Sequence, residues 1–280
     1  MNDLQKKELD IFAVKARLLL MEGIFNAKAG HPGGSLSICE ILAYLYNCEM
    51  KVDPKNPKDP DRDRFVLSKG HAAPALYATL ALKGFFPAED MKTLRKSDSY
   101  LQGHPNMNLV PGVDMSTGSL GQGVSAAVGM ALSAKLDKKD FRVYTILGDG
   151  EIEEGQVWEA AMFASAKTLD NLVVIVDNNN LQIDGTVEEV NSPYPILEKF
   201  AAFGFNTIEI DGNNLYEIED ALKSARETKG KPTAIIAKCL KGKGVSYMED
   251  AVNWHGAAPN EELYNQAVEE LTATLKNLEA

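Results

Sequence analysis

Residues 142–180 read RVYTILGDGEIEEGQVWEAAMFASAKTLDNLVVIVDNNN. A short apolar run over 142–147 is followed by a helical pattern over 153–168 and by a second apolar run over 172–176. Short strands that are apolar on both faces and separated by a helix are typical of parallel sheets covered on both sides. The stretch therefore predicts a strand–helix–strand unit in which polar loops follow both strands.

The same alternation extends outward in both directions. We expect further strands over 65–67, 207–210 and 233–238. We expect helices over about 6–28, 35–48, 74–84, 120–136, 196–203, 215–228 and 261–278. The fold class is therefore α/β, a parallel sheet with helices on both faces, forming one domain over 1–280. The amphipathic helix from about 261 is expected to cover the sheet.

Charge and composition exclude several classes of protein. The 29 basic and 40 acidic side chains give a net charge of −11, which argues against nucleic-acid or membrane partners. The three cysteines, Cys39, Cys48 and Cys239, lack CxxC spacing and are predicted to be buried free thiols. The chain starts without a signal-type apolar segment, and no stretch approaches the roughly 18 apolar residues of a membrane span. We expect a cytoplasmic protein.

The two strand ends of the opening stretch carry the sharpest chemical signal. Gly148-Asp149-Gly150-Glu151 follows one strand and Asp177-Asn178-Asn179 ends the other, with 179 − 149 = 30 residues between Asp149 and Asn179. Neighbouring parallel strands bring these side chains to one sheet edge. Carboxylate and amide oxygens suit magnesium or calcium, and magnesium completes its shell with phosphate oxygens and water. The glycines allow close approach of a phosphate, so the spacing predicts a metal–diphosphate site rather than two ordinary turns.

All four histidines of the chain lie in glycine-flanked loops. Their settings are AGHPGG around His31, SKGHAAPALY around His71, QGHP around His104 and WHGA around His255. A single histidine is usually structural, but four in such loops indicate a site.

These motifs resemble those of a known family. GDG followed after about thirty residues by NN resembles the motif of thiamine diphosphate enzymes. The four histidine settings and residues 116–123, STGSLGQG, resemble transketolases, with Ser119 where that family has proline. The resemblance runs from about residue 10 to 260.

The resemblance implies roles for named residues. The magnesium ligands, with calcium or manganese as alternative ions, would be Asp149, Asn179 and the backbone carbonyl of Leu181. The diphosphate of thiamine diphosphate would contact His71, the Gly150 backbone, Asn179 and His255. The aminopyrimidine would lie near Gly118, Ser119 and Leu120. The groups facing the substrate hydroxyls or assisting catalysis would be His31, His104, His255 and Glu154, the last of which matches a family glutamate at the interface between active sites.

The resemblance also implies a partner. Transketolases continue into a second domain that supplies the glutamate activating the cofactor and the cationic residues binding sugar phosphate. After Pro259 this sequence has 280 − 259 = 21 residues. We therefore expect an N-terminal transketolase subunit that works with a C-terminal transketolase subunit in an α2β2 assembly. The expected reaction transfers a two-carbon ketol unit from a ketose phosphate to an aldose phosphate.

Four other interpretations stay open at this point. The chain could be the alpha subunit of a 2-oxo acid dehydrogenase or part of a 1-deoxyxylulose-phosphate synthase, although GHPGG and KGHAAPALY match transketolases better. It could be a non-catalytic cofactor-binding half. It could be an unrelated phosphate-binding protein, although GxxxxGK[ST] and strand-linked GxGxxG sequences are missing.

Residues 241–244, KGKG, fit a phosphate contact or a solvated mobile loop, and we favour the loop.

Overall fold

Five parallel strands form the central sheet in this computed structural model, which describes residues 1–280. Their order is β1-β2-β3-β5-β4, and every neighbouring pair is parallel. The strands are β1 (Arg64–Leu67), β2 (Val143–Gly148), β3 (Leu172–Asn178), β4 (Asn206–Asp211) and β5 (Thr233–Lys238). The α/β fold class predicted from the sequence is confirmed. Each predicted strand is present, with ends shifted by at most two residues.

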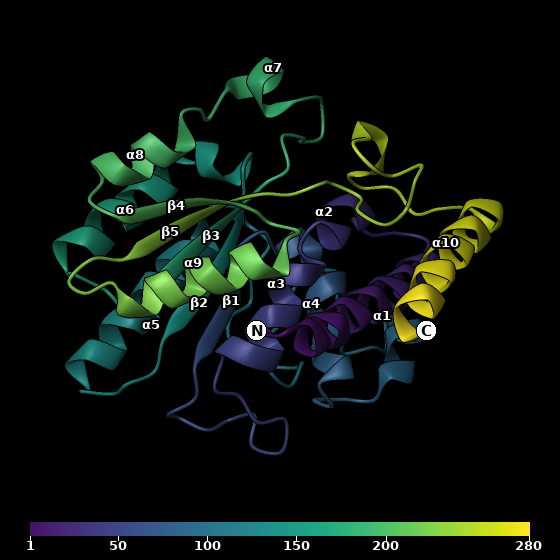
Figure 1. Ribbon diagram of the computed structural model, residues 1–280, viewed down its shortest axis with the longest axis horizontal. Coiled ribbons are helices and arrows are strands. Elements are labelled where there is room, and N and C mark those ends of the chain that lie inside the picture. Colours follow the sequence, from purple (N-terminus) through teal and green to yellow (C-terminus); the bar gives the residue numbers. More distant parts are fainter.

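Helices cover both faces of this sheet (Figure 1). They are α1 (Asp3–Ala27), α2 (Pro32–Leu36), α3 (Cys39–Tyr44), α4 (Ala73–Leu82), α5 (Gln122–Leu136), α6 (Gly155–Ala166), α7 (Val187–Asn191), α8 (Ile196–Ala202), α9 (Leu215–Glu227) and α10 (Glu261–Glu279). Single helical turns occur at Gly70–Ala72, Ala88–Thr93, Glu151–Glu153 and Val252–Trp254, and a wider turn at Leu45–Glu49. No helix of the structure is both long and apolar enough to cross a membrane.

Alternate residues of β1, β2, β3 and β5 enter two separate hydrophobic cores, whereas β4 contributes only to the larger one. In β2, Tyr144 and Ile146 belong to the larger core, which includes residues of α1, α3, α4 and α9. Val143 and Leu147 of the same strand belong to the smaller core, which includes residues of α5, α6 and α8. Burial of both faces is what makes the strands read as continuous apolar runs in the sequence.

Three expectations need correction. The helix predicted over 35–48 is interrupted between α2 and α3, and Ser35 lies inside α2, where its Oγ donates to the carbonyl of His31. The helix α10 packs along α1 rather than on the sheet, as Figure 1 shows for the yellow and purple helices. Among the predicted buried thiols only Cys39 is fully buried, because Cys48 is exposed and Cys239 is half-buried.

The strand register brings the motif loops to one edge of the sheet. Gly148 at the end of β2 pairs with Asp177 of β3, and Asn178 pairs with Lys238 of β5. The segments that follow β1, β2, β3 and β5 therefore meet at the carboxyl ends of the strands. This is the place where open parallel sheets bind ligands.

Candidate active site

The four histidines converge although they come from four separate loops. The ring centroid of His31 lies 5.3 Å from that of His71, 5.7 Å from that of His255 and 6.3 Å from that of His104. His71 and His255 are stacked at 5.2 Å. His31 immediately precedes α2, and His71 lies in the turn after β1. The structure thus brings together the histidines that the glycine-flanked settings singled out.

Three of these histidines, His31, His71 and His255, border a cavity of about 230 Å³ at the carboxyl ends of the strands. Its lining includes most of the residues proposed from the sequence: His31, His71, Gly118, Leu120, Asp149, Gly150, Asn179, Leu181 and His255. His104 reaches this group through its contact with His31. Ser119 and Glu154 are exposed and lie outside the lining, so within this chain they do not face the cavity.

Gly118 illustrates why this loop requires glycine. Its φ of +146° belongs to the region that favours glycine, and a Cβ at this position would lie 3.1 Å from the ring of His104. A side chain here would therefore push the imidazole away from the other histidines.

Burial keeps the histidines neutral. It lowers the pKa of His31 to about 4, with further lowering from the charges of His104, Arg95 and Lys241. Burial and the charge of Lys241 lower the pKa of His255 to about 3, and burial places the pKa of His71 well below its usual value. Neutral imidazoles each carry one donor and one acceptor nitrogen at pH 7, which suits them to hold or move a proton.

Asp149 places a buried carboxylate at the cavity. The residue is 2% exposed, and no cationic side chain lies within ion-pair distance. Its Oδ2 accepts hydrogen bonds from the backbone N–H of Asn180 at 2.6 Å and from Nδ2 of Asn178 at 3.2 Å, and its Oδ1 accepts from the N–H of Gly150 at 2.9 Å. Burial and the nearby charge of Asp177 raise the pKa of Asp149 to about 6. This carboxylate forms no ion pair, although the charge of Lys241 across the cavity acts on it.

Lys241 places a buried ammonium at the same cavity. It is 1% exposed, and its Nζ donates to the carbonyl of Leu181 at 2.7 Å and contacts Nδ1 of His255 at 3.1 Å. No carboxylate lies within ion-pair distance of it, and burial with the charge of Lys69 lowers its pKa to about 8. The interpretation of residues 241–244 as a solvated loop is therefore wrong for Lys241.

Three further buried residues support the site: Lys69, Asp177 and Glu151. None of them was predicted as a site residue from the sequence. Lys69 forms a buried ion pair with Asp177, whose Oδ2 also accepts from Ser37 and Asn179 at 2.7 and 2.8 Å. Glu151 accepts from Ser68 Oγ at 2.5 Å, from Gly121 N at 2.9 Å and from Gly148 N at 3.0 Å. Lys69 adjoins the histidine motif and Glu151 adjoins GDG, but only their burial, which the sequence does not reveal, separates them from surface charges.

Three buried ionisable side chains that line the cavity have no ion-pair partner: Asp149, Glu151 and Lys241. Uncompensated buried charges are costly unless a ligand neutralises them. A divalent cation would compensate Asp149, and a phosphate group would compensate Lys241. The donor set therefore fits a metal–diphosphate group.

Comparison with known proteins agrees with this chemistry. Residues 10–275 match the family described as "Transketolase, thiamine diphosphate binding domain". The chain is 49% identical over 267 residues to the 6-deoxy-6-sulfo-D-fructose transketolase subunit SqwG of Clostridium sp. (strain MSTE9), covering 95% of this chain and 97% of that one. It is 45% identical over 276 residues to an apulose-4-phosphate transketolase subunit of Phocaeicola vulgatus, covering 99% and 98%.

Solved structures agree as well. The transketolase of Campylobacter jejuni superposes with a TM-score of 0.90 at 35% identity, covering 99% of this chain and 46% of that longer chain. Sequence motifs, fold, cavity and relatives converge: the chain belongs to the transketolase family and carries its thiamine diphosphate binding domain.

Proposed function

We propose that this chain is the N-terminal subunit of a two-chain transketolase and that its histidine-lined cavity holds the metal and diphosphate of thiamine diphosphate. The observation that carries the proposal is the cluster of four histidines, three of which border a cavity that is also lined by Asp149 and Lys241, neither of which has an ion-pair partner. With a C-terminal subunit, the chain transfers a two-carbon ketol unit from a ketose phosphate to an aldose phosphate.

Asp149, Asn179 and the carbonyl of Leu181 would hold the magnesium ion. All three residues line the cavity and offer the oxygen atoms that magnesium prefers. The Leu181 carbonyl already accepts from Lys241, but a carbonyl oxygen has a second lone pair. A bound cation would hold Asp149 ionised, since it supplies a counter-charge.

Lys241, His71 and His255 would bind the diphosphate. The ammonium of Lys241 cannot accept a hydrogen bond, so Nδ1 of His255 accepts from it and the neutral ring carries its proton on Nε2. That tautomer makes His255 a donor, as an anion requires. Residues 118–120 would lie beside the aminopyrimidine.

Bound thiamine diphosphate supplies a nucleophilic carbon that accepts and passes on the two-carbon unit. The chain's own contribution is to orient the substrate and to exchange protons with it. His31 and His104 would hold the substrate hydroxyls, and their lowered pKa values leave each ring neutral at pH 7, with one donor and one acceptor nitrogen for hydrogen bonds. Glu154 is proposed to act at the interface between active sites, where a partner would cover its exposed side chain.

Several observations support a partner. Both relatives of nearly equal length are named as subunits, and the longer transketolase extends well beyond the region that this chain matches. Large apolar side chains are exposed at the cavity lining and on α6: Leu120, Met162, Phe163 and Ile183. We infer that a partner covers these side chains. We propose an α2β2 assembly in which the partner supplies the activating glutamate and the substrate-phosphate ligands.

The test is a donor assay with the reconstituted pair of subunits. Xylulose 5-phosphate, apulose 4-phosphate and 6-deoxy-6-sulfofructose would be offered with an aldose acceptor, and pyruvate would be offered in parallel. We expect turnover of at least one ketose and none of pyruvate. Turnover of pyruvate alone would favour a 2-oxo acid dehydrogenase.

Asp149→Asn tests the metal site in the same assay. The variant keeps the size of the side chain but removes its charge, so we expect at least a hundredfold loss of magnesium-dependent activity. Asp220→Asn, which removes an exposed acid on α9, is the matched control and should retain full activity. An Asp149→Asn enzyme as active as this control would refute the metal assignment.

A further inference from the structure

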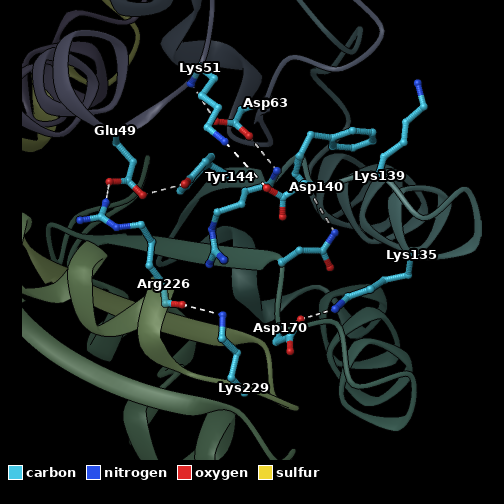
Figure 2. Close-up of a pocket in the computed structure, with 13 residues that line it drawn as sticks. Glu49, Lys51, Asp63, Lys135, Lys139, Asp140, Tyr144, Asp170, Arg226 and Lys229 are labelled. Atoms are coloured by element: carbon cyan, nitrogen blue, oxygen red, sulfur yellow. Dashed lines mark hydrogen bonds and ion pairs between the residues drawn. The ribbon is translucent and has the colours of Figure 1, made fainter.

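A second cavity lies at the opposite edge of the sheet from the histidines. It has a volume of about 410 Å³ and is bordered by residues just before β1, β2 and β3 and by the C-terminal ends of α5 and α9. Figure 2 shows its charged lining. Phe141 and Tyr144 are the only aromatic or aliphatic residues among the thirteen that line it. The volume suits a small molecule, and the lining suits a hydrophilic one.

The charge of this cavity is opposite to that of the chain. Six basic residues line it (Lys51, Lys135, Lys139, Arg142, Arg226 and Lys229) against four acidic ones (Glu49, Asp63, Asp140 and Asp170). The difference is 6 − 4 = +2, whereas the whole chain carries −11. A local excess of positive charge on an acidic protein attracts anions to one place.

The acidic residues of the lining are already engaged. Glu49 pairs with Arg226 and accepts from Tyr144, and Asp170 pairs with Lys135. Both ion pairs appear at the border of the cavity in Figure 2. Asp63 accepts the backbone N–H groups of Lys51 and Arg142, each at 2.7 Å. The exposed Asp140 contacts Lys51 at 3.9 Å.

Two basic residues remain without a carboxylate. Nη2 of Arg142 donates to the carbonyl of Ala225 at 3.1 Å, and Nζ of Lys229 donates to the carbonyl of Arg226 at 3.0 Å. Both carbonyls belong to the C-terminal end of α9, so both cations are anchored at that end of the helix. Nε of Arg142 is buried and has no acceptor. Neither cation forms an ion pair, although the charge of Lys229 acts on Asp170, and the unpaired buried Nε of Arg142 calls for an acceptor.

We propose that this cavity binds a phosphate group, with Arg142 and Lys229 as its ligands. A guanidinium offers a planar fork that matches phosphate oxygens, and an ammonium beside it adds a second point charge. The ligand is a phosphate ion or a small polar phosphate monoester whose hydroxyls meet the remaining polar groups. The inference is independent of the function proposed for the histidine cavity, since no residue is shared between the two linings.

Calorimetric titration at constant ionic strength tests the site with three probes: inorganic phosphate, glycerol 1-phosphate and glycerol. The protein is the full chain. We expect saturable binding of at least one phosphate-bearing probe and none of glycerol. Tighter binding of the monoester identifies an organic phosphate as the ligand, and equal or weaker binding identifies the free ion. Absence of saturable phosphate binding overturns the proposal.

Three single-residue variants test whether phosphate binds in this cavity. Arg142→Gln should weaken it at least tenfold and Lys229→Gln about threefold, whereas Lys223→Gln removes an exposed charge from the same helix outside the cavity and should leave binding unchanged. Phosphate held at the histidine cavity would persist in all three variants, so equal binding by all of them overturns the site. Lys229 is exposed, so its variant decides the question if Arg142→Gln fails to fold.

Discussion

Lys69, which lines the histidine cavity, forms a buried ion pair with Asp177, and the two side chains are 1% and 0% exposed. Removing one member of such a pair leaves an uncompensated buried charge and costs about 3–5 kcal/mol. We predict that Lys69→Met lowers the free energy of unfolding by about that amount in urea titrations. The double variant Lys69→Met/Asp177→Asn should recover part of the loss. Equal unfolding midpoints for Lys69→Met and the unaltered chain would show that the pair contributes nothing.

The lowered pKa of His31 should make the stability of the folded chain depend on pH. Its pKa is about 4 in the folded chain, chiefly because it is buried, against about 6.5 when unfolded. The unfolded state therefore binds more protons between these values, so the stabilisation is complete above pH 6.5 and is lost as pH falls toward 4. We predict that the free energy of unfolding falls less between pH 7 and pH 5 in His31→Gln than in the unaltered chain. Parallel pH profiles would contradict the shift.

Some residues of the site could be predicted from the sequence and others could not. The histidines and Asp149 could be predicted because glycine-flanked loops and strand ends give them a local signature. Lys69, Glu151 and Lys241 could not, because a buried charge and an exposed one look alike in a sequence. Only the tertiary structure decides which charges are taken out of water.

At the scale of elements, the turn Glu151–Glu153 links three segments of the site. The Glu151 carboxylate accepts from Ser68 after β1, from Gly121 at the start of α5 and from Gly148 at the end of β2. Gln in its place keeps one acceptor oxygen, so at least one buried donor loses its partner, at a cost of about 1–3 kcal/mol.

We predict that Glu151→Gln lowers the thermal midpoint and weakens the binding of thiamine diphosphate. Glu159→Gln on α6, where the acid is exposed, serves as the control and should change neither. Differential scanning calorimetry with and without cofactor measures both effects. A Glu151→Gln chain that behaves like the control would mean that this link does not hold the loops together.

The helices and strands show what periodicity can and cannot predict. Apolar runs identified every strand, most strongly the four whose faces are both buried, whereas β4 has only Ile210 buried. The interruption between α2 and α3 left none, because Ser37 at that point donates to Asp177, which lies 140 residues further along the chain. The packing of α10 on α1 was equally hidden, since an amphipathic pattern shows that a face is buried but not against which element.

At the scale of the whole molecule, the parallel sheet brings distant loops together at the site. Its register places the loops after β1, β2, β3 and β5 at one edge, so motifs as far apart as His71 after β1 and His255 after β5, with a sequence separation of 255 − 71 = 184, border one cavity. The rule that ligands bind at the carboxyl ends of parallel strands made this edge predictable. The phosphate cavity at the other edge was not predictable, because its basic residues are scattered singly along the sequence.

The most direct test is a crystal structure of the chain with thiamine diphosphate and manganese, which can replace magnesium and gives an anomalous signal. We predict one strong anomalous peak bonded to the carboxylate of Asp149 and the side-chain oxygen of Asn179, with diphosphate density reaching Lys241 and His255. A peak at any other place, or diphosphate density outside the histidine cavity, would contradict the proposed site.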